Sequence, residues 1–168
     1  MAEARRKKEN IKVPEIAHDV FEGARIVDIK ELAENLKCRQ CERILSLKDT
    51  VKETHMGLHS IFHITCKKCD IVNKVQSGKT HKTNENSSYC DVNTKAVLGS
   101  IYAGQGYTAL NKLLSCLNVP NIPSDVYKRY EMLVGPTIEE AAKDSCRQGA
   151  LEEKKLIIQR VDELCEAL

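Results

Sequence analysis

Two pairs of cysteines constrain this chain more than any other feature of its sequence. Cys38 and Cys41 are separated by two residues, and Cys66 and Cys69 repeat that spacing. A two-residue spacer lets both sulfurs of a pair face one point, and two such pairs supply the four soft ligands that tetrahedral Zn²⁺ prefers. The 24 residues between the pairs suit a β-hairpin that brings the two turns together.

We therefore predict a structural Zn²⁺ site with these four cysteines as its ligands. Four thiolates occupy every tetrahedral position and leave none for a reactive water, so the free energy of metal binding becomes free energy of folding. The alternative is a set of independent buried or redox thiols. A redox pair usually begins a helix in a βαβ unit and needs no second pair, whereas here two pairs flank a pattern typical of strands.

The remaining cysteines and the nearby histidines are weaker ligand candidates. Four cysteines without a partner at ligand spacing are expected to be small, buried or half-buried thiols: Cys90, Cys116, Cys146 and Cys165. Three histidines recur at every fourth position before the second pair: His55, His59 and His63. On a strand His59 and His63 share one face, where they replace a ligand, touch phosphate or simply meet solvent. The solvated face is the preferred interpretation.

Composition excludes several classes of protein. The 168 residues include no tryptophan and two phenylalanines, so several small cores fit better than one large aromatic core. No run approaches the ~18 apolar residues of a membrane span, and the first residues, MAEARRKKEN, hold no apolar signal-peptide core. We expect an intracellular protein without a disulfide framework.

The charge is unevenly distributed along the chain. Residues 37–82 hold ten Lys or Arg against four Asp or Glu, a balance of +6, and residues 137–168 hold five against eight, a balance of −3. A basic segment favours a polyanionic partner. Five of its lysines are expected to contact DNA phosphates: Lys67, Lys68, Lys74, Lys79 and Lys82.

Hydrophobic periodicity predicts an α+β chain: a small β zinc ribbon, an all-helical helix-turn-helix region and a carboxy-terminal helix. The predicted segments are a basic, loosely ordered terminus (1–24), the ribbon (25–82), a polar linker (83–90), three helices (91–136) and carboxy-terminal helices (137–168). Within the first segment, Arg5-Arg6-Lys7-Lys8 is a nuclear import signal, a phosphate-contacting arm or a solvated terminus. The nucleus is the expected location.

The three predicted helices begin at good N-cap residues, Asn93, Thr108 and Ser124, and the third ends at Gly135-Pro136. Glycines in Ala103-Gly104-Gln105-Gly106 permit the sharp turn of a helix-turn-helix unit. The third helix is the predicted DNA reader, with four side chains placed to meet DNA: Ser124, Tyr127, Lys128 and, to one side, Arg129. A plain three-helix bundle with polar faces fits the same pattern.

The last segment is predicted to contain a fourth helix from Thr137, a break at Gly149 and a final amphipathic helix. Its apolar stripe consists of Ile157, Val161, Leu164 and Leu168. Through residues 150–168 the chain pairs with a second copy or packs on a catalytic domain.

No complete catalytic site is predicted. Gly78-Lys79-Thr80 matches only the end of a phosphate-binding loop, because position 73 is Asn73 where that loop needs glycine. The acid pairs Glu139-Glu140 and Glu152-Glu153 occupy adjacent helical positions and cannot face one site.

The order of several phrases resembles the Mutator-like transposase domain of animal Mutator-type DNA transposons and of host proteins derived from them. These phrases, over roughly residues 25–150, are Arg25-Ile26-Val27-Asp28, the two cysteine pairs, Asp91-Val92-Asn93-Thr94-x-Ala96-Val97-Leu98-Gly99, Ala103-Gly104-x-Gly106, Leu113-Leu114-Ser115-Cys116-Leu117-Asn118-Val119-Pro120 and Val134-Gly135-Pro136.

The resemblance implies that this region precedes a ribonuclease-H-like core, which cuts and rejoins DNA with three carboxylates and divalent metal. None of that core's motifs can be placed in this chain, which resembles an amino-terminal fragment, a truncated product or a domesticated remnant. We therefore expect a zinc-dependent module that binds duplex DNA like that of transposon ends and is not itself an enzyme. The rival hypothesis is a protein-interaction adaptor or dimerisation module.

Overall fold

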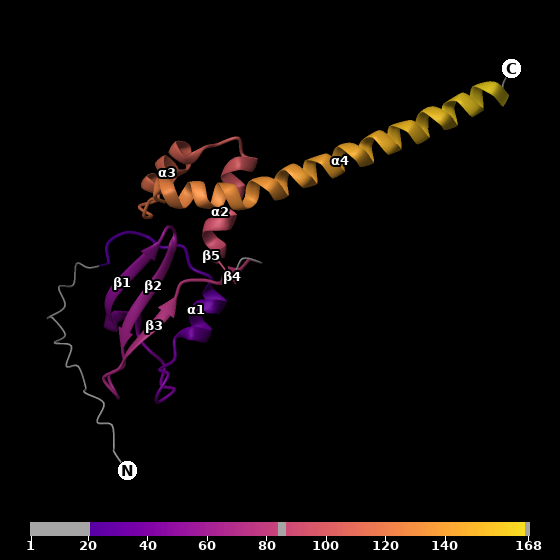
Figure 1. Ribbon diagram of the computed structural model, residues 1–168. Helices are drawn as coiled ribbons and strands as arrows, with labels where there is room; N and C mark the ends of the chain where they lie inside the picture. The colour runs from indigo at the N-terminus through magenta and orange to yellow at the C-terminus, as the bar shows by residue number, and fades with distance from the viewer. Residues whose placement is uncertain (1–20, 84–86, 167–168) are drawn as a thin grey trace, which may run out of the picture.

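The computed structural model describes residues 21–83 and 87–166, and an α+β class is confirmed (Figure 1). In chain order the elements are α1 (Ile29–Asn35), the 3-10 turn η1 (Leu47–Asp49), β1 (Thr50–Met56), β2 (His59–Thr65), β3 (Val72–Gln76), β4 (Thr80–Lys82), β5 (Ser88–Cys90), α2 (Asp91–Tyr102), α3 (Tyr107–Cys116) and α4 (Ser124–Glu166). The predicted basic run at residues 5–8 and the apolar Leu168 lie outside the described residues.

Strands β1, β2 and β3 form an antiparallel sheet in that order. Because side chains alternate across a strand, the sheet has an inner face that includes Phe62, Ile64 and Val75, and an opposite outer face. The inner face packs with α1 and the cysteine turns, where Leu32 and Leu36 contact a buried cluster around Ile64. Asp28 caps α1 by accepting the N–H of Glu31 at 3.1 Å.

A second core lies among the helices, and the two small cores match the expectation from composition. Its fully buried members include Val97 of α2 and Ile122 before α4, and Leu58 from the β1–β2 turn inserts into it. Figure 1 shows this turn directed at the helices, while the opposite end of the sheet carries the cysteine turns. The sheet therefore connects the two cores.

Asn93 of α2 attaches the β1–β2 turn to the helices. Its Oδ1 accepts the N–H of Leu58 at 2.8 Å, and its Nδ2 donates to the carbonyl of Met56 at 2.7 Å. Gly57 between them has a φ of 66°, and a Cβ at this position would lie 2.7 Å from Asn93 Oδ1. Only glycine satisfies both the left-handed backbone and the close approach.

Tyr130 of α4 completes this attachment. Its hydroxyl accepts the N–H of Cys90 at 2.8 Å and lies 3.3 Å from the Nδ2 of Asn93. Three elements thus share one buried polar network. The sequence pattern assigned Asn93 to the N-cap of its helix, but Cys90 holds that position and Asn93 is buried in the third helical position.

The predicted linker at 83–90 is partly a strand. Ser88–Cys90 pairs with Thr80–Lys82 in a two-stranded antiparallel sheet. His81 Nδ1 lies 2.7 Å from Asp91 Oδ1 and its ring stacks on Tyr89. Part of the polar segment that suggested a linker therefore belongs to these two paired strands.

The prediction that a helix ends at Gly135-Pro136 is wrong, as are the separate start at Thr137 and the break at Gly149. Helix α4 runs for 43 residues from Ser124 to Glu166 with Pro136 inside it. Val134 and Ile138, on either side of the proline, both pack into the helical core and hold the helix together across it. The carbonyl of Met132, which loses its donor, lies on an exposed face where water can replace that donor.

Two other helix predictions are corrected. Gly106, rather than Thr108, occupies the N-cap of α3. The apolar faces of α2 and α3 are narrower than their sequence suggests, because four members are exposed: Leu98, Tyr102, Leu113 and Leu117. In the same helices Val97, Leu110 and Leu114 are buried.

His59 is buried, which contradicts the expectation that it lies on a solvated strand face. Its side chain is 0% exposed, and neither ring nitrogen has a hydrogen-bond partner among the described residues. Burial lowers the pKa of His59 from its ordinary value, because the charged form loses hydration in the interior. The ring is therefore neutral in the folded protein at pH 7.

Within residues 21–83 and 87–166, no helix combines the length and hydropathy that a membrane span requires.

Replacing Asn93 with alanine should destabilise the fold by about 2–4 kcal/mol, because the buried Leu58 N–H and Met56 carbonyl lose their partner. Urea unfolding of the metal-loaded chain measures this. Asn35→Ala is the control, since its exposed amide bonds only within α1 and its removal should cost less than about 0.5 kcal/mol. Equal costs for the two variants would contradict the assigned role of Asn93.

His59→Phe should make the fold less sensitive to acid. The unfolded chain binds a proton at the ordinary histidine pKa of 6.5 and the folded chain binds it at a lower pKa. The stability contributed by neutral His59 is therefore complete above about pH 6.5 and is lost as the pH falls, at a slope of up to about 1.4 kcal/mol per pH unit. Urea unfolding at pH 7.5 and pH 6.0 should show a smaller loss for the variant than for the parent. An identical loss would exclude His59 as the responsible group.

Candidate metal centre

The two cysteine pairs lie in two copies of one turn. The N–H of Glu42 donates to the carbonyl of Cys38 at 2.9 Å, and the N–H of Asp70 donates to the carbonyl of Cys66 at 2.8 Å. Glu42 and Asp70 follow the first cysteine of their pairs by four residues, and both are left-handed, with φ of 55° and 53°. The matching backbone bends each segment so that both its sulfurs point to the same side. Neither position is a glycine, so this left-handed geometry could not be predicted from the residue types.

The four sulfurs converge on one point. All four lie within 4.8 Å of one another. The shorter separations are 3.3 Å for Cys69–Cys41, 3.4 Å for both Cys38–Cys69 and Cys69–Cys66, and 3.6 Å for Cys41–Cys66. A tetrahedron with Zn–S bonds of ~2.3 Å has sulfurs about 3.8 Å apart. The cluster is therefore of the right size for a tetrahedral metal ion, as the spacing of the pairs predicted. Among the described residues no histidine joins it.

The acidities of the thiols also favour a bound cation. Backbone N–H groups of Cys41 and Gln40 lower the pKa of Cys38 to about 6, and those of Cys69 and Lys68 lower the pKa of Cys66. The pKa of Cys69 is raised, first by its hydrogen bond to Cys41 and then by burial. Two turns thus stabilise thiolates, while the crowding of four sulfurs makes one retain its proton. A divalent cation relieves that crowding more effectively than the proton does.

Asn73 holds the first cysteine turn in place, a role that was not predicted from the sequence. This buried side chain on β3 accepts the N–H of Arg39 with its Oδ1 at 3.0 Å, and its Nδ2 lies 3.8 Å from Cys38 Sγ. A ligand that receives such a hydrogen bond is held in a fixed orientation. Asn73 shares the inner face with Val75, and a polar residue at a buried strand position was the available signal.

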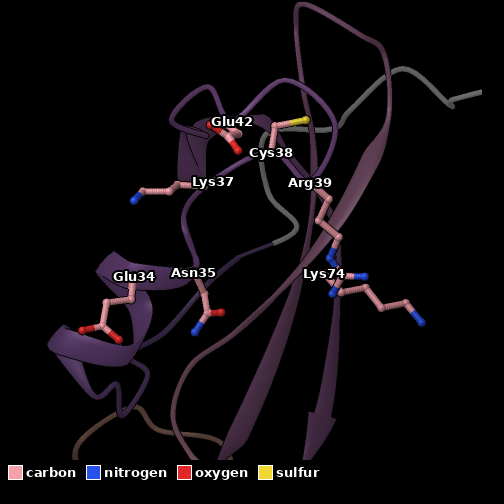
Figure 2. Close-up of a pocket in the computed structure, with 7 residues that line it drawn as sticks. All are labelled: Glu34, Asn35, Lys37, Cys38, Arg39, Glu42 and Lys74. Carbon is pink, nitrogen blue, oxygen red and sulfur yellow. The ribbon is translucent and has the colours of Figure 1, made fainter.

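A hollow of about 470 Å³ lies beside the first cysteine turn, between that turn, the end of α1 and β3 (Figure 2). It is lined by Glu34, Asn35, Lys37, Cys38, Arg39, Glu42 and Lys74. Figure 2 shows Arg39 reaching toward Lys74, while the sulfur of Cys38 points away from both. The first cysteine turn therefore carries the guanidinium of Arg39 on one side and the sulfur of Cys38 on the other.

The other cysteines differ in environment. Cys90 is buried as expected, whereas three are exposed, contrary to the expectation: Cys116, Cys146 and Cys165. Burial raises the pKa of Cys90, which favours an unreactive thiol.

The lysines expected to contact phosphate are all exposed, but they spread along the length of the sheet region. Lys67 and Lys68 lie in the second cysteine turn, Lys74 on β3, Lys79 just before β4 and Lys82 at its end. Lys67 Nζ forms an ion pair with Asp49 at 2.8 Å. Its neighbour Lys68 has no such partner among the described residues.

The four predicted reader residues of α4 do not share one surface. Tyr127 is wrongly placed by the sequence pattern: it is buried in the helical core, 3.0 Å from Ser100 Oγ through its hydroxyl. Arg129 lies with its guanidinium 4.6 Å above the Tyr89 ring and donates to the carbonyl of Ser88 at 2.8 Å. Ser124 and Lys128 are exposed as expected.

Comparison with known proteins gives one match. Residues 23–167 match the model of a family described as Mutator-like transposase. No curated protein and no solved structure matches the chain.

The zinc-loaded chain should show three thiols that react quickly with a thiol reagent, because three cysteines are exposed and the four clustered ones would be masked by metal. A chelator should release at least four more. Cys146→Ser serves as the control: it should lower the number of fast-reacting thiols from three to two and leave both the number released by the chelator and the zinc content unchanged. Cys66→Ser should lose the bound zinc. Rapid labelling of Cys38 in the presence of zinc would instead indicate a redox pair.

Proposed function

The chain belongs to the Mutator-like transposase family, and from this premise we propose that it is a zinc-dependent, nuclear DNA-binding module. Cys38, Cys41, Cys66 and Cys69 hold the zinc, and the module binds duplex DNA such as transposon ends. It acts by binding, and we assign no catalytic residue to it.

The convergence of the four sulfurs carries the zinc assignment. Four thiolates at tetrahedral spacing leave no open coordination position, so the ion would act in folding and not in chemistry. When bound, it supplies two positive charges that hold the thiolates together. Asn73 and the backbone N–H groups of the turns orient those thiolates.

The surplus of basic residues supports DNA as the partner. Lys67, Lys68, Lys74, Lys79 and Lys82 supply affinity for phosphate that is independent of sequence and falls steeply with salt. Since the ion pair with Asp49 already compensates the charge of Lys67, we expect Lys67 to contribute least of the five lysines to the affinity for DNA.

We propose a smaller role for the start of α4 in reading DNA sequence. Ser124 and Lys128 remain available to phosphates or bases. Tyr127 acts from inside the core, where it fixes the angle between α4 and α2 through Ser100. Arg129 acts through its contacts with Tyr89 and Ser88, which hold the β4–β5 hairpin against α4.

The second candidate function is a protein-interaction or dimerisation module, and the exposure of α4 favours it. Figure 1 shows the second half of α4 projecting away from the rest of the chain. It carries five exposed large apolar side chains: Leu151, Leu156, Ile157, Ile158 and Val161. A second copy or a catalytic domain would cover them. Ile157→Glu with Val161→Glu in the full chain should halve the sedimenting mass if they pair two copies.

The principal test is binding of the zinc-loaded full chain to labelled duplex DNA, followed by fluorescence anisotropy. Five phosphate contacts predict a loss of affinity of roughly 500-fold between 50 and 200 mM salt. A chelator, or Cys66→Ser, should abolish binding because the basic segment unfolds. Salt-insensitive binding, or none, would contradict the proposal. A selection from random duplexes then reports whether any sequence is preferred.

A further inference from the structure

The outer face of the three-stranded sheet carries a row of basic side chains that cross all three strands. Lys52 on β1 is in register with His63 on β2, and His63 is in register with Lys74 on β3. Residues opposite one another in an antiparallel sheet point to the same side. The three therefore form a line about 10 Å wide, given a spacing of ~4.8 Å between strands.

The outer face of the three strands carries no acidic side chain, and the nearest acids beside Lys74 are Glu34 and Glu42, which line the same hollow. The side chains on the outer face, apart from the buried His59, are Lys52, Thr54, Met56, Ile61, His63, Thr65, Val72, Lys74 and Gln76. Glu53, the one acid of these strands, points to the inner face, where Arg25 binds it at 2.7 Å. Among the described residues, no ion pair reaches Lys52, His63 or Lys74. Protonation of His63 between Lys52 and Lys74 would place three like charges side by side, which is unfavourable unless an anion joins them.

The electrostatics of the row favour a bound anion. Partial burial, Lys74 and Lys52 together lower the pKa of His63, so the free protein keeps this ring neutral at pH 7. Thr54 Oγ1 lies 3.2 Å from His63 Nε2, which leaves Nδ1 without a protein partner among the described residues. A bound anion would reverse the effect of the lysines and favour the protonated ring.

We propose that this outer face is a docking surface for the phosphate backbone of duplex DNA, with His63 taking up a proton as DNA binds. The inference rests on the proposed function and deepens it by naming the surface. Arg39 extends the row beyond β3, since it lines the same hollow as Lys74 and reaches toward it (Figure 2). Thr54 and Gln76 beside the row add polar groups that suit phosphate or base edges.

The dimensions and the charge both fit a duplex. A row about 10 Å wide is narrower than the ~12 Å major groove, so phosphates on both sides are within reach of the lysines. The surface also lies at the exposed part of the sheet, away from the end where Leu58 and His59 are buried at the helices. An acidic peptide would offer fewer and more mobile charges than a duplex does.

The sign of the pH dependence follows from the change in the pKa of His63. Because DNA raises a pKa that the free protein holds low, affinity increases as the pH falls through the pKa of the bound state. A neighbouring opposite charge shifts a pKa by roughly one unit or more, and one unit corresponds to about tenfold in affinity. His55 and His81 face Glu53 and Asp91 instead, away from this row.

The experiment measures anisotropy of a labelled 20-base-pair duplex with the zinc-loaded full chain between pH 8.0 and pH 6.0. The parent should gain affinity by about tenfold toward acid, in keeping with the shift expected for one phosphate. His63→Gln should show no such gain, because glutamine cannot take up a proton. His55→Gln, a histidine on the inner side, should retain the gain. Zinc content is measured for each variant.

A second measurement tests the lysines through the dependence of affinity on salt. Lys52→Gln with Lys74→Gln should reduce the slope of log affinity against log salt by about 1.8, or 0.9 for each phosphate lost. Lys154→Gln with Lys155→Gln on α4 removes the same charge from a distant place and should leave the slope nearly unchanged.

Each of the other outcomes contradicts either the docking surface, the proposed function or DNA as the occupant. If the parent binds DNA but neither His63→Gln nor the lysine pair alters binding, this docking surface is wrong and the proposed function stands. If the parent binds no duplex at pH 8.0 or pH 6.0, both are wrong. Stronger binding to an acidic peptide than to the duplex, lost in the same variants, overturns DNA as the occupant.

Discussion

The structure depends on four sulfurs that two separate turns force into one small volume. Neutral thiols or thiolates at 3.3–3.6 Å gain little from one another, and thiolates repel. The backbone nevertheless bends twice into a left-handed residue, at Glu42 and Asp70, to bring them together. Backbone strain of this kind persists where its surroundings compensate it, and a divalent cation is the compensation that this donor set supports. The hydrophobic cluster beside the cysteines is small, which makes such a contribution important.

The sheet links this site to the helices through its opposite end. Phe62, Ile64 and Val75 align the strands over α1, and the β1–β2 turn then delivers Leu58 and its neighbours to Asn93. Ordering one end of a stiff hairpin therefore orders the other. The outer face of that hairpin remains open, and its cations are held in a fixed register. In this arrangement the cysteine cluster, the basic surface and the helices belong to one unit, although none of the four clustered cysteines belongs to the basic surface or to the helical core.

Sequence patterns predicted the parts that rest on composition and short spacing. The convergence of the cysteine pairs, the α+β class and the division into small cores follow from ligand chemistry, periodicity and composition. The failures occur where tertiary contacts override local preference. A proline such as Pro136 ends a helix when nothing packs beyond it. Here Ile138, two residues further on, packs against the helical core, and the helix continues. Asn93 prefers a cap but finds a better partner in the β1–β2 turn. His59 and Tyr127 were predicted to be exposed, but both are buried. Strand alternation and helical phase cannot show which faces other elements cover.

Helix α4 has a consequence for spectroscopy of this protein. Its 43 residues exceed those of the other three α-helices together, and much of its length makes no contact with either core. Local hydrogen bonds and ion pairs such as Lys143–Glu139 sustain that part. Far-ultraviolet circular dichroism will therefore report chiefly on the projecting part of α4, which makes no contact with the four clustered cysteines. If removal of the proposed cation unfolds the sheet, the helical spectrum will hardly change. Near-ultraviolet signals from Tyr89, Tyr127 and Tyr130 are therefore the more faithful indicators of the native state.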